Sequence, residues 1–312
     1  MIISASRRTD IPAYYSDWFM NRIKEGYLYV RNPMNYHQVS EITLSRDVVD
    51  CIVFWTKNPT PMLDKLDELK DYPFYFQFTL TGYGKDVEAH LPDKKKVLIP
   101  AFQELASKIG PERVILRYDP IIFNERYTPE YHLQAVSQIT ESLKGYTNKC
   151  VISFVDVYRK NQKNLEMLNY TEMSVENLTD FCKELATIAN GNGMQVATCS
   201  EFIDLEAAGI EHNACIDRRL VERIIGAPLK VARDKNQRNE CQCVESIDIG
   251  LYNTCKNGCK YCYANFSESM LRENMKKYDV NSPLLCGIID EQDKITKRAM
   301  KSLVESQIKL DL

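Results

Sequence analysis

Short apolar runs recur along the chain and are separated by longer segments of mixed polarity. Most of these runs are continuously apolar and rich in β-branched residues, and they cover Ile2–Ala5, Cys51–Thr56, Phe74–Thr81, Val114–Tyr118, Cys150–Asp156, Met194–Cys199 and Ile247–Tyr252. Such runs are typical of strands that are covered on both faces, as in a parallel sheet. The pattern therefore predicts about seven parallel strands.

Between these runs, apolar residues recur at intervals of three and four, which predicts helices. The helical segments are Tyr15–Glu25, Pro61–Lys70, Val97–Ile109, Pro129–Lys144 and Ser174–Ala189. Strands that alternate with helices on this scale form βα units with right-handed crossovers. We therefore expect an α/β fold, namely a partial TIM-like βα barrel. The segment His37–Asp47 predicts a small hairpin inserted after the first helix.

The length of 312 residues is compatible with one domain, because α/β barrels of this size commonly form a single unit. We expect one domain over residues 1–312. Within it, residues 1–200 hold βα units and residues 201–265 form a cysteine-rich region that includes the last strand. Residues 266–312 are expected to form C-terminal helices.

Composition and charge exclude several classes of protein. Apolar residues make up 44% of the chain and charged residues 27%, which is ordinary globular composition. Forty basic against 43 acidic residues is not the basic excess of a dedicated nucleic-acid binder. No run of apolar residues is long enough to span a membrane, and no leader segment stands out. We expect a soluble, cytoplasmic protein with no membrane partner.

Cysteine is the unusual component of the sequence. The chain has 11 cysteines, and seven of them fall between Cys199 and Cys262. Clustered cysteines in a reducing compartment indicate metal binding more than disulfides. The scattered Cys51, Cys150 and Cys182 fall in strand or helix patterns and are expected to be small buried apolar residues.

The most specific motif follows the last predicted strand. It reads Cys255-Lys-Asn-Gly-Cys259-Lys-Tyr261-Cys262, a C-x3-C-x2-C spacing. Three thiolates on one short loop can hold three irons of a 4Fe–4S cluster and leave the fourth iron without a protein ligand. Gly258 permits a tight turn of this loop. A zinc knuckle that uses the same thiolates is the alternative.

This motif, including the aromatic Tyr261 before the third cysteine, resembles the signature of the radical S-adenosylmethionine (SAM) superfamily. The resemblance implies a 4Fe–4S cluster on Cys255, Cys259 and Cys262 whose open iron chelates SAM. It also implies reductive cleavage of SAM to a 5′-deoxyadenosyl radical, which takes a hydrogen atom from a substrate. Tyr261 would then border the adenine of SAM, and the electron would come from a reductant such as flavodoxin or ferredoxin.

In that superfamily the motif normally follows the first strand, whereas here it lies near the C-terminus. Four segments resemble, in this order, those that follow the cluster strand in spore photoproduct lyase and its relatives: Thr9-Asp10-Ile11-Pro12, Trp55-Thr56-Lys57-Asn58-Pro59, Phe78-Thr79-Leu80-Thr81 and Arg117-Tyr118-Asp119-Pro120. This resemblance implies a circular permutation that makes the cluster-bearing strand C-terminal and places it beside Ile2–Ala5. The whole chain also resembles an uncharacterised radical-SAM-like family known only as a domain of unknown function.

Polar residues at the predicted strand ends are the further candidates, because the chemistry of α/β barrels lies where strands end and βα loops begin. We expect a pocket for SAM and substrate to be lined by Arg7, Arg8, Asp10, Lys57, Arg117 and Asp119. Arginine makes paired hydrogen bonds with planar anions. A salt-bridged loop at the first three residues, and a structural ion pair of Arg117 with Asp119, are the alternatives.

Six further residues are weaker candidates or structural expectations. Asp156, Tyr158 and Glu201 follow strands and are weaker candidates for the site. The run Lys94–Lys96 predicts a solvated turn, with a phosphate-steering patch as the alternative.

Four cysteines remain in the cysteine-rich region, namely Cys199, Cys215, Cys241 and Cys243. They suffice for an auxiliary 4Fe–4S cluster, and such clusters are common in the superfamily. Structural zinc, or four unligated thiols, are the alternatives.

The sequence therefore predicts a radical SAM enzyme with one or two iron–sulfur clusters. Two other classes remain open. One is a zinc-stabilised nucleic-acid-binding protein, and the other is an iron–sulfur redox or sensor protein without SAM chemistry. The substrate can be a small molecule, a peptide or a nucleic acid.

Overall fold

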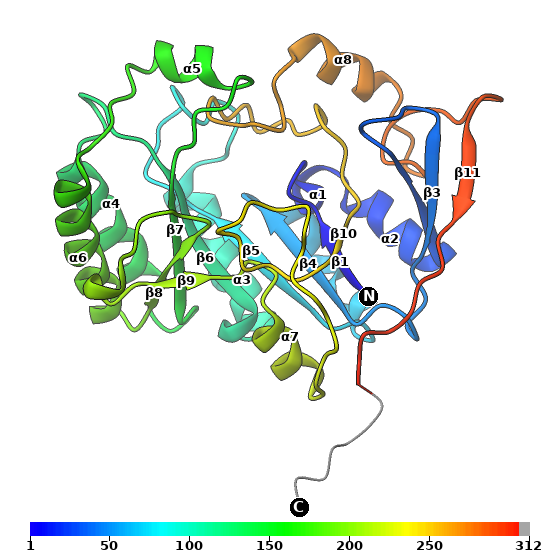
Figure 1. The fold of residues 1–312 in the computed structure, drawn as a ribbon, viewed down its shortest axis with the longest axis horizontal. Coiled ribbons are helices and arrows are strands. Elements are labelled where there is room, and N and C mark those ends of the chain that lie inside the picture. The colour runs from blue at the N-terminus through cyan, green and yellow to red at the C-terminus, as the bar shows by residue number, and fades with distance from the viewer. Residues whose placement is uncertain (306–312) are drawn as a thin grey trace, which may run out of the picture.

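The computed structural model describes residues 1–305 of the chain, and its main element is an eight-stranded sheet (Figure 1). The strands are β1 (Ile2–Ala5), β4 (Cys51–Thr56), β5 (Phe74–Thr79), β6 (Val114–Ile121), β7 (Lys149–Phe154), β8 (Gln195–Cys199), β9 (Glu211–Asn213) and β10 (Ile247–Asp248). Their order is β10-β1-β4-β5-β6-β7-β8-β9, and every neighbouring pair is parallel. The prediction of an α/β fold with a large parallel sheet is confirmed.

The sheet differs from the prediction at its two edges. Strand β10 has two residues instead of the six expected over 247–252, and β9 adds a strand that the apolar pattern does not indicate. The sequence Glu211-His212-Asn213 of β9 is polar because this strand pairs with β8 alone. Within residues 1–305, no strand pairing joins β9 to β10, so the hydrogen-bonded sheet is open rather than a closed barrel.

The first and last strands of the main sheet lie side by side. Ile3 pairs with Ile247 and Ser4 with Asp248, in parallel register. The Asp248 carboxylate accepts hydrogen bonds from Ser4 Oγ at 3.0 Å and from Ser6 Oγ at 2.6 Å. The expectation that the cysteine-bearing segment returns beside Ile2–Ala5 is confirmed by this pairing.

Helices flank the sheet, and their apolar faces supply the core. They are α1 (Ile11–Tyr14), α2 (Ser16–Glu25), α3 (Ile99–Ile109), α4 (Pro129–Ser142), α5 (Gln162–Met167), α6 (Val175–Gly191), α7 (Arg218–Ile225) and α8 (Glu268–Lys276). The side chains of Thr128 and Ser174 cap α4 and α6, which lie next to each other (Figure 1). The helix expected over Pro61–Lys70 is a 3-10 helix, Thr60–Leu69. None of the helices in residues 1–305 has the length and apolar character of a membrane span.

A second, three-stranded sheet stands beside the main one. It contains β2 (Tyr27–Arg31), β3 (Gln38–Thr43) and β11 (Lys294–Lys297), in the order β11-β3-β2. The expected hairpin therefore exists, but it begins at Tyr27, before the expected segment. The last part of the chain, expected to be helical, holds α8 and the strand β11 within residues 266–305.

Candidate metal and cofactor site

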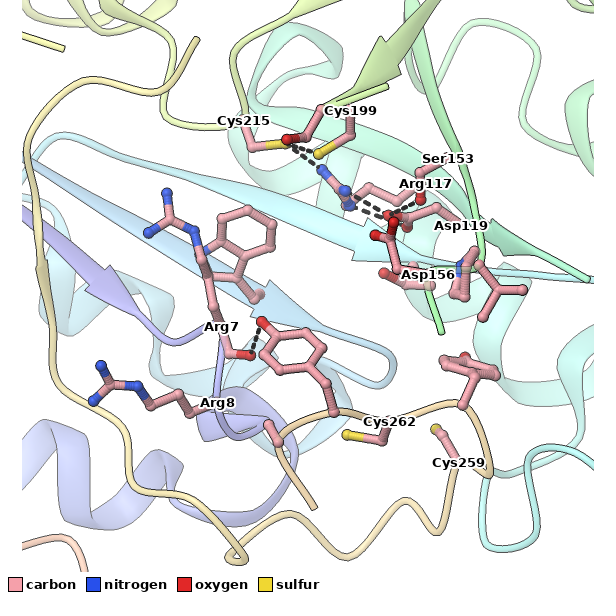
Figure 2. A pocket seen from close by; sticks show the side chains of 18 of the residues that line it. Arg7, Arg8, Arg117, Asp119, Ser153, Asp156, Cys199, Cys215, Cys259 and Cys262 are labelled. Carbon is pink, nitrogen blue, oxygen red and sulfur yellow. Dashed lines mark hydrogen bonds and ion pairs between the residues drawn. The ribbon is translucent and has the colours of Figure 1, made fainter. Parts of the chain in front are cut away.

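A cavity of about 490 Å³ opens at the carboxyl end of the main sheet. Loops after β1, β4, β8 and β10 surround it, together with the ends of β6 and β7. The main predicted site residues line this one cavity: Arg7, Arg8, Asp10, Lys57, Arg117, Asp119, Cys199, Cys215, Cys241, Cys243, Cys255, Cys259, Tyr261 and Cys262. Of the weaker candidates, Asp156 and Tyr158 also line it, whereas Glu201 does not. Figure 2 shows Cys259 and Cys262 on one side of the cavity and Cys199 and Cys215 on the other.

The loop that carries Cys255, Cys259 and Cys262 is tightly constrained. Gly258 has a φ of +67°, and a Cβ at this position would lie 2.6 Å from Cδ2 of His90. This explains why the motif needs glycine there. The backbone of the loop is held from outside by His90 N, which donates to Asn257 O at 3.1 Å, and by Tyr15 Oη, which donates to Thr254 O at 2.6 Å.

The three thiols of this loop are only partly exposed, and their surroundings oppose ionisation. Burial raises the pKa of Cys259 to about 12, although the Lys57 ammonium lowers it in part. Burial also raises the pKa of Cys255 and Cys262. Such thiols stay protonated unless a cation binds, because metal coordination removes the proton outright. The donor set therefore suits a positively charged metal centre better than a free nucleophile.

The spacing of the thiols distinguishes a cluster from a single ion. Around tetrahedral zinc, with bonds of about 2.3 Å, the sulfur atoms lie about 3.8 Å apart. Within residues 1–305 no three cysteines bring their Sγ atoms within 4.8 Å of one another. The three cysteines of the motif are thus more widely spaced than a single zinc ion requires. A 4Fe–4S cluster is larger and separates its thiolates further, so the residues present fit it better.

Glu88 connects the cysteine loop to the rest of the site, and the sequence analysis missed it. Its side chain is 1% exposed and lies between two lysines, with Lys57 Nζ at 2.8 Å and Lys94 Nζ at 2.6 Å. Tyr261 Oη donates a hydrogen bond of 2.5 Å to Glu88 Oε1. The neighbouring ammonium groups more than offset burial and lower the pKa of Glu88 to about 2. Glu88 is thus a buried anion that holds Tyr261 and Lys57 at the cavity wall.

The hydrogen bonds of Glu88 change the expectations for Lys94 and Lys57. Lys94 does not belong to a solvated turn, because its ammonium donates to Thr81 O and Tyr83 O as well as to Glu88. Lys57 is already paired with Glu88, and it also lies 5.4 Å from the centre of the Tyr261 ring. No pattern in the sequence indicates that an isolated glutamate becomes the shared partner of two lysines.

Asp10 lies in the cavity wall but its oxygens are occupied by the protein. It accepts from Ala13 N at 3.1 Å, Lys57 N at 2.8 Å and Asn257 Nδ2 at 3.1 Å. It thereby caps helix α1 and ties the cysteine loop to the loop after β4. Burial raises the pKa of Asp10 despite these hydrogen bonds. Asp10 therefore positions the cysteine loop through Asn257 and the loop after β4 through Lys57 N.

Arg117 and Asp119 form the ion pair that was one of the two alternatives. Arg117 Nη2 lies 2.5 Å from Asp119 Oδ2, and Nε donates to Oδ1 at 3.1 Å. The remaining nitrogen of Arg117, Nη1, donates to Cys215 Sγ at 2.7 Å (Figure 2). The pair therefore faces the second group of cysteines, Cys199, Cys215, Cys241 and Cys243.

Arg7 and Arg8 point away from each other (Figure 2). The guanidinium of Arg7 lies 5.3 Å from the centre of the Trp55 ring, and that of Arg8 lies 5.1 Å from the centre of the Tyr252 ring. Nη2 of Arg7 is buried and has no hydrogen-bond partner. Trp55 also contacts Arg117 at 5.1 Å, so its ring lies near two guanidinium groups, a role that its strand-end position alone did not indicate.

The fold and the site define an α/β protein whose cysteine-rich loops meet over the carboxyl edge of a parallel sheet. The chain belongs to the family described as Domain of unknown function (DUF1848), whose model matches residues 2–264. The match includes the main sheet and both groups of cysteines, and it ends just after Cys262. A comparison with curated proteins gives no match.

Proposed function

We propose that this protein is a radical SAM enzyme built on a circularly permuted, partial βα barrel. The observation that carries the proposal is the C-x3-C-x2-C loop, whose three thiols line a cavity at the carboxyl edge of the sheet. Cys255, Cys259 and Cys262 would hold a 4Fe–4S cluster. When bound, such a cluster supplies an open iron for SAM and the electron for its reductive cleavage.

The pairing of β10 with β1 supports the permuted arrangement. It puts the cysteine loop next to the loop Ser6–Asp10, although more than 240 positions separate them in the sequence. In an unpermuted chain the same neighbours would follow each other directly. Pairing of the first and last strands is a condition under which a fold tolerates permutation.

The residues around the cavity hold one another in place. Tyr261 and Lys57 lie in one wall, and the buried Glu88 behind them accepts a hydrogen bond from each. Asp10 fixes the position of the cysteine loop through Asn257. Radical chemistry benefits from such enclosure, because solvent and stray hydrogen donors would quench a reactive intermediate. The unpaired Nη2 of Arg7 offers a hydrogen bond to an anionic group in the cavity.

The spacing of the thiols disfavours a single zinc ion at the motif. The balanced charge of the chain disfavours nucleic-acid binding. An iron–sulfur protein without SAM chemistry is the second candidate, and SAM cleavage separates it from the proposal. The substrate class stays open between small molecules, peptides and nucleic acids.

The test is SAM cleavage by anaerobically purified, reconstituted protein in the presence of dithionite. We expect slow formation of 5′-deoxyadenosine and methionine, measured by liquid chromatography and mass spectrometry. Changing Cys255, Cys259 or Cys262 to Ala should abolish the product, whereas Cys182→Ala, in helix α6, should not. Cleavage that persists in all three variants, or iron and sulfide without any cleavage in the wild type, would refute the proposal.

A further inference from the structure

The second group of cysteines converges from three separate segments of the chain. Cys199 ends β8, Cys215 follows β9, and Cys241 and Cys243 precede β10. The Sγ atoms of Cys199 and Cys215 are 3.1 Å apart. The side chain of Cys243 contacts those of Cys215 and Cys241. The fold thus brings four thiols together that span 45 positions of sequence.

These sulfur atoms are hydrogen-bond acceptors in the structure. Arg117 Nη1 donates to Cys215 Sγ at 2.7 Å, Ile216 N to Cys243 Sγ at 3.3 Å, and Asn213 Nδ2 to Cys215 Sγ at 3.8 Å. A neutral thiol is a weak acceptor, so several N–H donors around one group of thiols indicate a place for thiolates. Buried apolar cysteines would not need them.

Arg7 supplies an independent observation at the same group. Its side chain is partly buried and contacts Cys243, and its buried Nη2 has no hydrogen-bond partner. A guanidinium buried with an unused N–H group is costly unless an acceptor completes it. The sulfur atoms of a metal cluster bound by these thiolates would be acceptors in the right place.

We propose that Cys199, Cys215, Cys241 and Cys243 bind a second 4Fe–4S cluster, on the wall of the cavity opposite the Cys255 loop and against the guanidinium groups of Arg7 and Arg117. Four thiolates occupy every iron of a cube, so this site is closed to further ligands. It is therefore distinct in kind from the three-cysteine site. Both sites border the same cavity, so a bound molecule would lie between them.

Two other outcomes are chemically reasonable for four thiols, and the geometry bears on each. A single zinc ion needs its sulfur atoms about 3.8 Å apart, whereas the Sγ atoms of Cys199 and Cys215 lie 3.1 Å apart and no three Sγ atoms within residues 1–305 lie within 4.8 Å of one another. Either metal centre therefore requires these side chains to rotate. A disulfide between Cys199 and Cys215 would explain neither the unpaired Nη2 of Arg7 nor the nearby thiols of Cys241 and Cys243. Structural zinc would also use all four thiols, but only the cluster adds sulfide ions that can accept hydrogen bonds from both arginines.

The experiment is metal counting on full-length protein that is purified and reconstituted anaerobically with ferrous iron and sulfide. Wild-type protein should contain about eight irons, which is the content of two cubes. Changing Cys255, Cys259 and Cys262 to Ala should leave about four irons, because one cube remains. Changing Cys199 and Cys215 to Ala should also halve the iron, and Cys182→Ala should leave it unchanged. No iron in the first variant, or zinc in place of iron, would overturn the proposal, and so would a Cys199–Cys215 disulfide in protein purified anaerobically without reductant.

A second measurement on the wild type covers the case in which a variant fails to fold. Electron paramagnetic resonance of the reduced protein should show two cluster signals, and SAM should alter only the one from the open three-cysteine site. A single signal would overturn the second cluster. A second cluster that persists without any SAM effect or cleavage would refute the proposed function and leave this inference standing.

Discussion

Replacing Glu88 with Gln tests the buried charge network beside the cysteine loop. The change keeps the shape of the side chain and one acceptor oxygen for Tyr261, but it removes the negative charge. Lys57 and Lys94 would then lie beside each other without a counter-ion, with side chains only 12% and 21% exposed. The perturbation is therefore electrostatic rather than steric.

The expected loss in the free energy of unfolding can be estimated in two ways. The pKa of Glu88 is lowered from 4.5 to about 2, and about 2.5 pKa units correspond to roughly 3 kcal/mol. Removing one partner of a buried ion pair typically costs about 3–5 kcal/mol. Burial lowers the pKa of Lys94 even beside Glu88, so this lysine can release its proton in the variant, which favours the lower value. We expect a loss of about 3 kcal/mol, or about a hundredfold in the folding equilibrium.

The assay is urea unfolding of wild type and Glu88→Gln at pH 7 under identical metal loading. Because the folded-state pKa is depressed, the contribution of Glu88 is present above the unfolded pKa near 4.5 and is lost as the pH falls toward 2. The matched control is Glu68→Gln, in the exposed pair with Lys24 at 2.8 Å, which should cost less than about 1 kcal/mol. Adding Lys94→Met to Glu88→Gln should recover part of the loss, since it removes the unpaired charge. A loss of less than about 1 kcal/mol for Glu88→Gln would refute the buried network.

Two further changes test other parts of the site. Burial raises the pKa of Glu201, which accepts a hydrogen bond from Phe154 N, to about 7. The folded state therefore loses stability as the pH rises from about 4.5 to 7, and Glu201→Gln should gain about 1–2 kcal/mol over wild type between pH 5 and pH 8, after allowance for partial exposure. Urea unfolding at both pH values checks this, and a constant gap between the two proteins would contradict it. Gly258→Ala should lower the iron bound by the Cys255 loop, because the new Cβ meets His90, whereas Gly209→Ala, with φ of +72° and open space around it, should keep the iron. Equal iron in both variants would show that the turn at Gly258 is not needed.

The strands inside the sheet and the cysteine motif above it could be predicted from the sequence alone. Continuously apolar runs such as Cys51–Thr56 can be covered on both faces only in a parallel sheet, so their pattern sufficed. The spacing of Cys255, Cys259 and Cys262 is local, and Gly258 marks the turn between them. The place of the last strand beside Ile2–Ala5 came from a resemblance between loops rather than from the pattern itself.

Which charges are buried, and which distant side chains contact each other, depends on the tertiary structure. Glu88 and Lys94 look like ordinary surface residues in the sequence, yet the fold encloses both. Arg117 reaches Cys215 from a position 98 residues away. Local patterns report the period and burial of one segment, whereas the stability of a buried charge depends on partners that other segments supply. That is why the sequence predicted the position of the site, while the fold decided the pairing of its charges.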